Sequence, residues 1–320
     1  QSNGGVMAVD PACRLPVRTA LSGPAAGVIA AGYIAQTAGF PDVITGDMGG
    51  TSFDVSLIAG GQSMLSPQTS IDFGMVVRTP MIEITTIGAG GGSIAWVDKG
   101  GLLNIGPESA GSNPGPVAYG LGNTRPTVTD ANVVLGRIDP DNPIGGKLER
   151  LDVEAASRAI DDHVGGPLGL STTEAAEAIL TVANSRMAGA IRLVSIERGY
   201  DPKRFAFMPF GGGGALHTGA LIDDVGLARA IVPRYPGVTS AMGDTAPFMV
   251  IGLLASLSVL PMAMIPRVSP LIEHAEPLPP HRLITMTPTG VMGSLGSGMV
   301  VAAAYTLLPL YLQRIGMSVN

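Results

Sequence analysis

The stretch DVITGDMGGTSFDVSLI, residues 42–58, decides the fold class of this chain. Two apolar runs flank a pair of glycines, and runs of this kind around a glycine turn predict a β-hairpin. We expect the first strand to end at the glycine pair and the second to end at the glycines after Ala59. Because a long helical pattern follows from residue 171 to Gly199, the sequence predicts an α/β domain built around this hairpin.

The turn of this hairpin favours phosphate binding. Gly49 and Gly50 permit positive φ and lack a Cβ, so an anion can approach consecutive N–H groups. Thr51 and Ser52 add hydroxyl donors. The same glycine pair also suits an ordinary tight hairpin with no ligand.

Two acidic residues border the turn. Asp47 and Asp54 would repel a bare phosphate. Both make sense if Mg²⁺, directly or through its waters, lies between carboxylate and phosphate. They are therefore the candidate metal ligands and catalytic carboxylates.

A second glycine loop is TTIGAGGGSIAWVDKGG, residues 85–101. It follows a β-branched run and leads into the apolar segment 94–97. Clustered glycines cost conformational entropy, so we expect this backbone to be accessible to a ligand. The candidate binding residues here are Gly90, Gly91 and Gly92.

A third loop lies in FAFMPFGGGGALHTGALIDDVGL, residues 205–227. An apolar strand leads into four glycines, and a helix is expected to start near Ala215. The free N–H groups at the start of this helix would point toward a ligand that approaches the glycine backbone. His217 would lie just inside this helix and is a candidate catalytic residue that could reach a phosphate or a reacting oxygen. A capping or packing role is about equally expected. The candidate binding residues are Gly211, Gly212, Gly213 and Gly214. No loop matches GxGxxG with its downstream acid or GxxxxGK[ST], so neither a Rossmann domain nor a P-loop enzyme is supported.

Helical signals are clear in residues 171–202. Ser171 or Thr172 can cap a helix with Glu174 in its first turn, and Gly199 is expected to end it. Its apolar residues recur at spacings of four and three, which core packing explains fully. Upstream, Asp130 and Asn132 precede an apolar stretch, and helix capping alone accounts for them.

Charge and cysteine usage exclude some functions. The net charge of −6 and the absence of any Lys/Arg run argue against nucleic acid as a partner. The single cysteine, Cys13, excludes an intrachain disulfide and a cysteine-based metal cage, and we expect it to be a buried thiol.

The composition changes after about residue 243. Residues 246–266 contain no charge and are long enough to cross about 30 Å of hydrocarbon as a helix. A second uncharged, glycine-rich stretch covers about 286–312. We therefore expect a two-helix membrane segment in residues 244–320, with its loop on the cytoplasmic side; the alternative is a pair of buried core helices.

Eight segments of residues 1 to about 243 together resemble the hydantoinase A/5-oxoprolinase family. The segments are QSNGG, LSGPAAGV, GDMGGTSFDVSLI, TIGAGGGSIAWVD, GPESAGSNPGPVAYG, TVTDANVVLGR, FGGGGALH and VPRYPGVTSAMG. The resemblance implies half of an actin-like, Hsp70-like (ribonuclease H-like) ATPase fold. It also implies a cytoplasmic enzyme that uses ATP and Mg²⁺ to open a cyclic amide such as a lactam or hydantoin.

By this resemblance DMGGTSFD is the second phosphate hairpin, with Asp47 and Asp54 near Mg²⁺ or the attacking water. FGGGGALH becomes the adenosine-side loop, and GAGGGS lines the same cleft. Phe53 stands where relatives usually have a small polar residue, and the glycine run with Ala215 departs from the commoner GGAGPLH.

The family's first phosphate hairpin, DxGGTFTD, is expected in a separate N-terminal half that is missing before QSNGG. Expected partners are therefore that half and a hydantoinase B-type subunit, with membrane contact through residues 246–312. Residues 244–320 themselves resemble the middle of a major facilitator transporter, and two helices form no transport path.

Three interpretations stay open. The chain is a fragment of a cyclic-amide hydrolase joined to transporter sequence, or a membrane-tethered nucleotide-binding module completed by a partner chain, or a non-catalytic relic of the fold.

Overall fold

The computed structural model describes residues 1–71, 75–143 and 148–241. The chain divides into two units, Gln1–Ala246 and Pro247–Asn320, and every described residue belongs to the first. The expected membrane segment and the transporter-like sequence lie outside the described residues.

The predicted hairpin forms the centre of the main sheet. β1 (Val43–Met48) pairs antiparallel with β2 (Phe53–Ala59). β11 (Ala206–Phe210) runs parallel to β1 on its other side, followed by β12 (Arg229–Ala230). β3 (Gln62–Ser63) and β8 (Thr85–Ile87) both pair antiparallel with β2. The strand order is β12-β11-β1-β2-β3, with β8 beside the turn end of β2, so the α/β prediction is confirmed.

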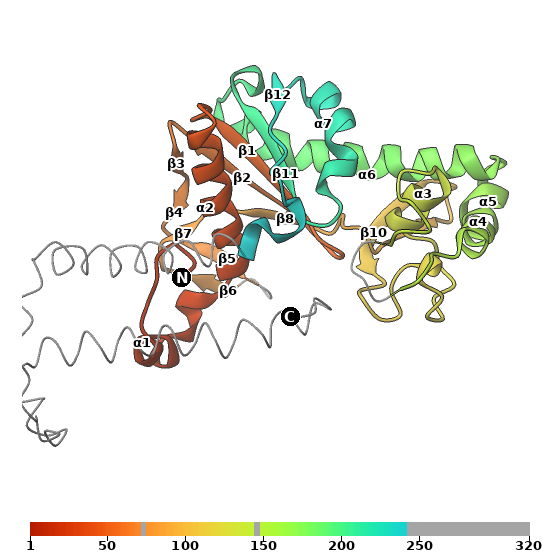
Figure 1. The fold of residues 1–320 in the computed structure, drawn as a ribbon, viewed down its shortest axis with the longest axis horizontal. Helices are drawn as coiled ribbons and strands as arrows, with labels where there is room; N and C mark the ends of the chain where they lie inside the picture. Colours follow the sequence, from red (N-terminus) through yellow and green to blue (C-terminus); the bar gives the residue numbers. More distant parts are fainter. Residues whose placement is uncertain (72–74, 144–147, 242–320) are drawn as a thin grey trace, which may run out of the picture. The chain divides into compact units, whose positions relative to one another are not determined.

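Helices cover both faces of this sheet (Figure 1). Side chains alternate between faces along a strand. Val43 and Ile58 accordingly pack against α2 (Ser22–Thr37) on one face. Ile44 and Val55 pack against α6 (Thr172–Val194) on the other face. Three layers result, helix on sheet on helix, each apolar strand face buried under its own helix.

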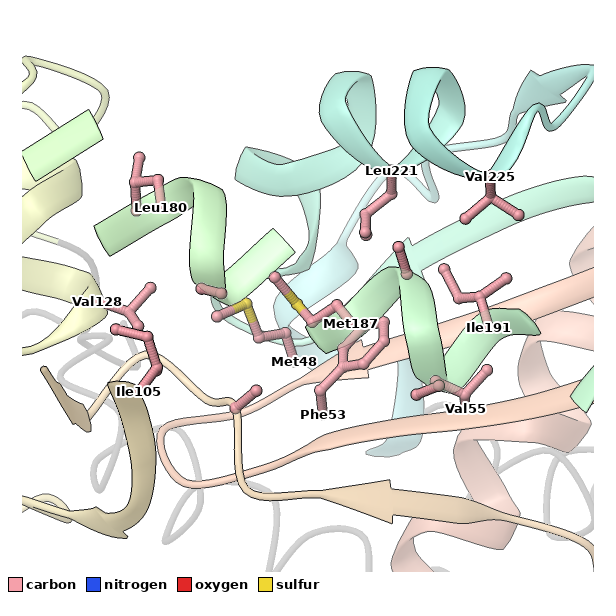
Figure 2. Close-up of a cluster of buried hydrophobic side chains, with 14 of the residues drawn as sticks. Met48, Phe53, Val55, Ile105, Val128, Leu180, Met187, Ile191, Leu221 and Val225 are labelled. Atoms are coloured by element: carbon pink, nitrogen blue, oxygen red, sulfur yellow. The ribbon is translucent and has the colours of Figure 1, made fainter. Parts of the chain in front are cut away.

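α6 has the predicted capped start. The Ser171 hydroxyl oxygen accepts the Glu174 N–H, and the Glu174 carboxylate accepts the Ser171 N–H in return. Figure 2 shows Met187 and Ile191 of this helix against Met48, Phe53 and Val55 of the hairpin. The helix ends at Val194, so the predicted end at Gly199 is wrong: Gly199, with φ +81°, closes the separate 3-10 turn Ile196–Arg198.

The same helix is the candidate membrane span in the described part of the chain. Thr172–Arg198 is the one stretch there that is long and apolar enough to cross a membrane by length and composition. Half of its most apolar 18-residue segment is buried inside the protein, as expected of a core helix.

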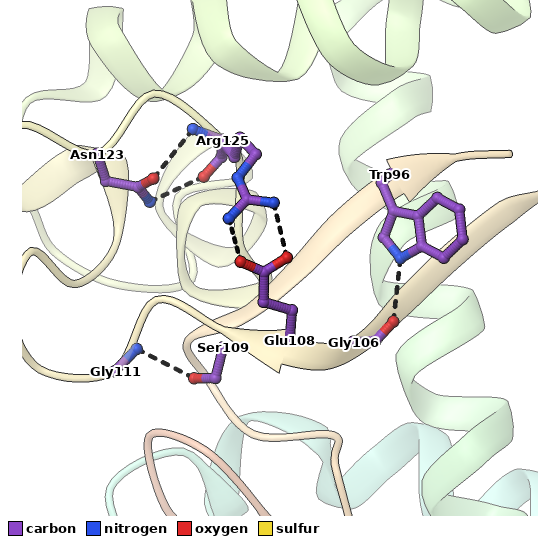
Figure 3. Close-up of polar contacts among 7 residues, drawn as sticks. All are labelled: Trp96, Gly106, Glu108, Ser109, Gly111, Asn123 and Arg125. Atoms are coloured by element: carbon purple, nitrogen blue, oxygen red, sulfur yellow. Dashed lines mark hydrogen bonds and ion pairs between the residues drawn. The ribbon is translucent and has the colours of Figure 1, made fainter.

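A second group of elements packs against the N-terminal part of α6. β9 (Ser93–Val97) and β10 (Leu103–Ser109) form an antiparallel pair. α3 (Val128–Val134) and α4 (Val153–Ile160) pack beside it and contact α6. Figure 3 shows a bidentate ion pair from Arg125, ahead of α3, to Glu108 of β10, and a Trp96 indole N–H donated to the Gly106 carbonyl. The ion pair ties β10 to the segment ahead of α3, and the Thr129 N–H, donated to the Gly91 carbonyl at 2.8 Å, ties the second glycine loop to the start of α3.

The start of α3 corrects one detail of the capping prediction. Thr127 is the N-cap, and Asp130 completes the capping box from the third helical position. The Asp130 carboxylate also accepts the N–H groups of Val117 and Ala118, which makes it a buried structural acid. Asn132 lies inside the helix and caps nothing.

The other elements are short and complete the chain order. They are α1 (Val9–Arg14), β4 (Leu65–Ser66), β5 (Thr69–Ile71), β6 (Met75–Val77), β7 (Met81–Ile82), α5 (Gly166–Leu168) and α7 (Thr218–Val225), with a π-helical turn at Asp161–Gly165 and 3-10 turns at Pro16–Thr19, Val117–Tyr119, Pro202–Arg204, Gly214–His217 and Pro236–Val238. Cys13 lies on α1 and is exposed, so the expectation of a buried thiol is wrong.

Candidate functional site

The hairpin turn presents free backbone donors. Gly49 uses its N–H within the turn, donating to the Ser52 carbonyl at 3.1 Å. Within the described residues, the N–H groups of Gly50, Thr51 and Ser52 donate to no acceptor. A Cβ built on Gly49 or Gly50 would meet nothing within 4 Å. This turn therefore leaves three consecutive N–H groups without an acceptor and has open space over its two glycines.

Glycine serves this turn differently from the expectation. Neither Gly49 nor Gly50 has positive φ, so the left-handed region is not why glycine stands there. Both residues are exposed, and what they contribute is the absence of a side chain over the backbone. That property is what close approach by an anion requires.

The second glycine loop packs directly onto this turn. Gly91 donates its N–H to the Gly49 carbonyl at 3.0 Å, and Gly92 donates to the Gly50 carbonyl at 2.6 Å. The Gly90 N–H donates to Ser93 Oγ at 2.9 Å. The donors of this loop are therefore used inside the protein and are not available to a phosphate, which departs from the expectation drawn from the sequence.

Tight packing explains the glycines of this loop. A Cβ on Gly90 would lie 2.6 Å from the backbone nitrogens of Thr51 and Ser52. One on Gly92 would lie 2.8 Å from the Gly50 carbonyl oxygen. The loop therefore packs against the backbone of the turn and holds it in place.

The third loop passes the end of β1. Gly211 adopts φ +78°, and a Cβ there would fall on Asp47 Oδ1 and on the Met48 carbonyl. The Gly213 N–H donates to that carbonyl at 3.1 Å. A 3-10 helix, Gly214–His217, starts close to the position predicted near Ala215 and continues directly into α7, which begins at Thr218. His217 therefore precedes the α-helix and does not lie inside it.

The two carboxylates face each other across the hairpin. Asp47 and Asp54 are directly opposite in the β1–β2 register. Burial raises the pKa of Asp47, opposed by a hydrogen bond from the Ser240 hydroxyl at 3.2 Å and reinforced by the charge of Asp54. Burial also raises the pKa of Asp54, which the Thr86 hydroxyl on β8 opposes.

Asp54 has an unused oxygen. Its Oδ1 is buried and has no hydrogen-bond partner among the described residues. A buried carboxylate oxygen without a partner is costly, and a cation or its bound water would satisfy it. The described residues hold no cluster of three or more His, Cys, Asp or Glu side chains, so a metal site here would rely on one or two carboxylates, as Mg²⁺ sites often do.

A cavity of about 180 Å³ joins parts of all three loops. Its lining includes Gly49, Gly50, Gly91, Gly212 and Gly213. His217 lines it as well, together with apolar side chains such as Met48 and Leu216. The structure thus brings parts of the turn, the second loop and the third loop together, as the family resemblance implied.

The remaining predicted residues lie outside this cavity lining. Asp47 and Asp54 lie on the sheet behind the turn rather than in the cavity wall. Thr51 and Ser52 belong to the open turn, and Thr51 Oγ1 lies 3.5 Å from Ser109 Oγ of β10. Those outside the lining are Asp47, Asp54, Thr51, Ser52, Gly90, Gly92, Gly211 and Gly214.

His217 is buried and neutral. Burial, with a contribution from the positive charge of Arg137, lowers its pKa to about 4. Its Nδ1 lies 2.6 Å from Asn184 Oδ1 of α6. Asn132 lines the same cavity and was read from the sequence only as a cap, because nothing local in TVTDAN marks a cavity side chain.

Comparisons with known proteins agree over this region. The chain is 43% identical over 244 residues to caprolactamase subunit alpha of Pseudomonas jessenii, covering 76% of this chain and 35% of that protein. It is 42% identical over 229 residues to the acetophenone carboxylase gamma subunit of Aromatoleum aromaticum, covering 71% and 31%. It is 36% identical over 257 residues to 5-oxoprolinase of Saccharomyces cerevisiae, covering 76% and 19%.

Solved structures show the same similarity. The ATP-dependent caprolactamase of Pseudomonas jessenii matches with a TM-score of 0.63 and 45% identity over 69% of this chain and 32% of that one. Nucleotide-free acetone carboxylase matches with a TM-score of 0.63 and 33% identity over 69% and 31%. The predicted actin-like ATPase fold is supported, and the chain spans about a third or less of these proteins. Residues 1–250 match the Hydantoinase/oxoprolinase family model, and the chain therefore belongs to the hydantoinase/oxoprolinase family.

Proposed function

We propose that this chain supplies the phosphate-binding hairpin of an ATP-dependent enzyme that opens a cyclic amide. The observation that supports it most is the turn Gly49–Ser52, which has three consecutive N–H groups without an acceptor among the described residues, open space over its glycines, and two carboxylates on the adjoining strands. Backbone donors of this kind bind phosphate oxygens. The relatives named above include proteins described as ATP-dependent, which supports ATP as the source of that phosphate.

In the proposed reaction the ring carbonyl oxygen attacks the γ-phosphorus of ATP and ADP leaves. A first water attacks the activated carbonyl carbon, the ring C–N bond breaks and the nitrogen takes up a proton, which leaves an acyl phosphate. A second water then hydrolyses this acyl phosphate to the carboxylate and free phosphate. The free N–H groups of Gly50, Thr51 and Ser52 stabilise negative charge on the phosphate oxygens. Thr51 and Ser52 also offer hydroxyls.

Asp47 and Asp54 fit a Mg²⁺ site, since Asp54 Oδ1 is buried without a partner and both carboxylates are on adjacent strands. When bound, Mg²⁺ neutralises phosphate charge. Asp47 is held in place by Ser240 and can also accept a proton from water, because burial raises its pKa toward the working range of a general base.

The substrate is proposed from what the relatives share. Caprolactam, 5-oxoproline, acetophenone and acetone, named in relatives of this chain, all carry a carbonyl oxygen. A cyclic amide is the proposed substrate because the P. jessenii caprolactamase subunit has the highest identity of the relatives named here. Three relatives are described as subunits, so we also propose partner chains: one with a DxGGTFTD hairpin and a hydantoinase B-type subunit.

The direct test is binding of Mg·ATP to the full 320-residue chain by titration calorimetry, in mild detergent. Saturable binding is expected. If the chain unfolds cooperatively, and is therefore folded, but does not bind Mg·ATP, the proposal is contradicted.

The catalytic test adds the proposed partners and measures ATP turnover with caprolactam, 5-oxoproline and hydantoin. Asp47→Asn should lower turnover by about 100-fold or more while leaving the melting temperature unchanged or higher. Unchanged turnover would remove Asp47 from the mechanism. Turnover with acetone and bicarbonate but with no cyclic amide would replace the proposed substrate by a ketone.

A further inference from the structure

The second glycine loop holds two carbonyl groups of the phosphate turn. The Gly49 carbonyl accepts the Gly91 N–H at 3.0 Å, and the Gly50 carbonyl accepts the Gly92 N–H at 2.6 Å. Both bonds come from outside the hairpin, so they are tertiary contacts and not part of the turn itself. The second loop therefore fixes two successive peptide units of the turn.

A carbonyl that is held also fixes the N–H group of the next residue. The peptide unit is planar and trans, so its C=O and N–H bonds point in opposite directions. The Gly50 N–H shares a peptide unit with the Gly49 carbonyl and therefore points away from Gly91. By the same geometry the Thr51 N–H points away from Gly92. Two N–H groups that have no acceptor among the described residues are thus turned away from the second loop together.

The bond to the Gly50 carbonyl is the last step of a short hydrogen-bond relay. The Thr129 N–H, in the first turn of α3, donates to the Gly91 carbonyl at 2.8 Å. The Gly92 N–H belongs to the same peptide unit as that carbonyl, and it donates to Gly50. The relay therefore runs from the start of α3 through one peptide unit of the second loop and ends at the Thr51 N–H.

A second relay of the same kind ends one residue earlier. The Ser93 N–H donates to the Gly90 carbonyl at 3.1 Å. The Gly91 N–H of that peptide unit donates to the Gly49 carbonyl, whose own unit carries the Gly50 N–H. The two relays lie on adjacent residues and both end at the open turn.

Hydrogen bonds in series polarise one another, because each bond shifts charge along the next peptide unit. Here both series end on N–H groups with no acceptor among the described residues. Their positive ends are therefore oriented before any ligand arrives. Donors that are fixed in advance need no reorganisation when negative charge approaches.

We infer that Gly91 and Gly92 are positioning residues, whose N–H groups hold the carbonyls of the turn so that the Gly50 and Thr51 N–H groups point together at phosphate oxygen. This inference rests on the proposed function, because it needs a phosphate at the turn. The donors of the second loop are used up within the protein and act on the nucleotide through the turn. A side chain added to this loop would act first on packing, so a test has to remove a donor without adding a side chain.

The test replaces single backbone N–H groups by oxygen in the full 320-residue chain. Glycolic acid in place of Gly92 turns one amide into an ester, which removes the N–H and keeps the shape of the chain. The dissociation constant for Mg·ATP, measured by titration calorimetry, should rise at least roughly 10-fold, because the Thr51 N–H loses its fixed direction toward a charged acceptor. Glycolic acid in place of Gly91 should give a smaller rise, because its bond is the longer of the two.

Gly101 supplies the matched control. Its N–H donates to the Asp98 carbonyl at 3.0 Å, in the turn between β9 and β10. Glycolic acid in place of Gly101 removes one backbone hydrogen bond of the same kind, so its melting temperature should fall as in the other two variants. Its affinity for Mg·ATP should stay within about 2-fold of the wild type.

A spectroscopic measurement tests the orientation without nucleotide. The amide ¹⁵N resonance of Thr51 should shift in the Gly92 variant and stay in place in the Gly101 variant, because a hydrogen bond at a carbonyl polarises the N–H of the same peptide unit. This readout would not respond to a general loss of stability. It also applies to the Gly91 variant at the Gly50 resonance, should the Gly92 variant fail to fold.

The outcomes separate the inference from the proposed function. Equal Mg·ATP affinity in the Gly91, Gly92 and Gly101 variants would overturn the inference and leave the proposed function standing. Unmoved Thr51 and Gly50 resonances would also overturn it. A folded wild-type chain that does not bind Mg·ATP would overturn the proposed function and the inference together.

Discussion

Two glycine segments of this domain look alike in sequence and differ in structure. In the turn Gly49–Ser52, three N–H groups donate to nothing among the described residues, and side chains on its glycines would meet only open space. In the loop Gly90–Gly92 every N–H is used, and added Cβ atoms would lie within 3 Å of neighbouring atoms. One segment keeps its backbone open and the other is packed closed.

The difference separates two reasons for glycine. Close packing requires glycine for the fold, because any side chain would displace backbone. An open, exposed turn without positive φ has no such requirement, so its glycines point to a ligand. The comparison predicts that substitutions in the two segments affect different properties: stability in Gly90–Gly92 and nucleotide affinity in Gly49–Ser52.

The largest stability effect is expected from Gly90→Ala. The new methyl would lie 2.6 Å from two backbone nitrogens, which cannot move away as a flexible side chain could. We expect a loss of about 1–3 kcal/mol in the free energy of unfolding, measured by urea denaturation. A loss below about 0.5 kcal/mol would mean that this loop is not tightly packed on the turn.

Gly50→Val should affect binding more than stability. Its side chain would stand over the open N–H groups, and we expect Mg·ATP affinity to fall by roughly 10-fold or more. The melting temperature should change little, because the residue is exposed and its Cβ meets nothing. Wild-type affinity in a folded Gly50→Val chain would place the phosphate elsewhere.

Asp54→Asn should stabilise the chain in the absence of nucleotide. Asp47 and Asp54 are like charges on opposite strands, and burial raises the pKa of each, so the folded state holds its protons more tightly than the unfolded state. The free energy of unfolding of the wild type therefore decreases as pH rises through the raised pKa values of the two carboxyls. This loss disappears as pH falls below the ordinary carboxyl pKa. At pH 7 removal of one charge should add about 0.5–1 kcal/mol, or a few degrees in melting temperature.

The check is a pair of melting curves. The gain from Asp54→Asn should be present at pH 7 and shrink toward pH 4. A stability loss at pH 7 would show that the two carboxylates are compensated within the chain and do not await a cation.

Gly49→Ala should have the smallest effect. Its methyl would meet nothing within 4 Å and its φ is not positive, so unfolding free energy should stay within about 0.5 kcal/mol of wild type. It is the matched control for Gly90→Ala, with the same chemical change in the other segment. A cost equal to that of Gly90→Ala would remove the distinction between the segments.

Local features of the fold were predictable from sequence. The hairpin at residues 42–58 follows from apolar runs around glycine, and the start of α6 follows from Ser171 and Glu174, which interact within one helical turn. The end of α6 was not predictable from Gly199, because a separate 3-10 turn intervenes.

Features that depend on distant contacts could not be predicted from residue patterns. The pairing of β1 with β11 joins residues 43–47 to 206–210, and sequence spacing carries no signal for it. The closed state of Gly90–Gly92 depends on carbonyls of the turn about 40 residues away. Asn132 became a cavity residue only once α3 was placed beside the glycine loops. The convergence of the three loops was expected from family resemblance.

The most direct test of the account is amide hydrogen exchange resolved to single residues, with and without Mg·ADP. In the free chain Gly50, Thr51 and Ser52 should exchange fast, while Gly91 and Gly92, whose N–H groups are bonded, should be protected. Nucleotide should protect Gly50 to Ser52 and leave Gly91 and Gly92 almost unchanged. Protection that appears only at Gly90–Gly92, or no change at the turn under saturating nucleotide, would contradict the claim that the open turn is the phosphate site.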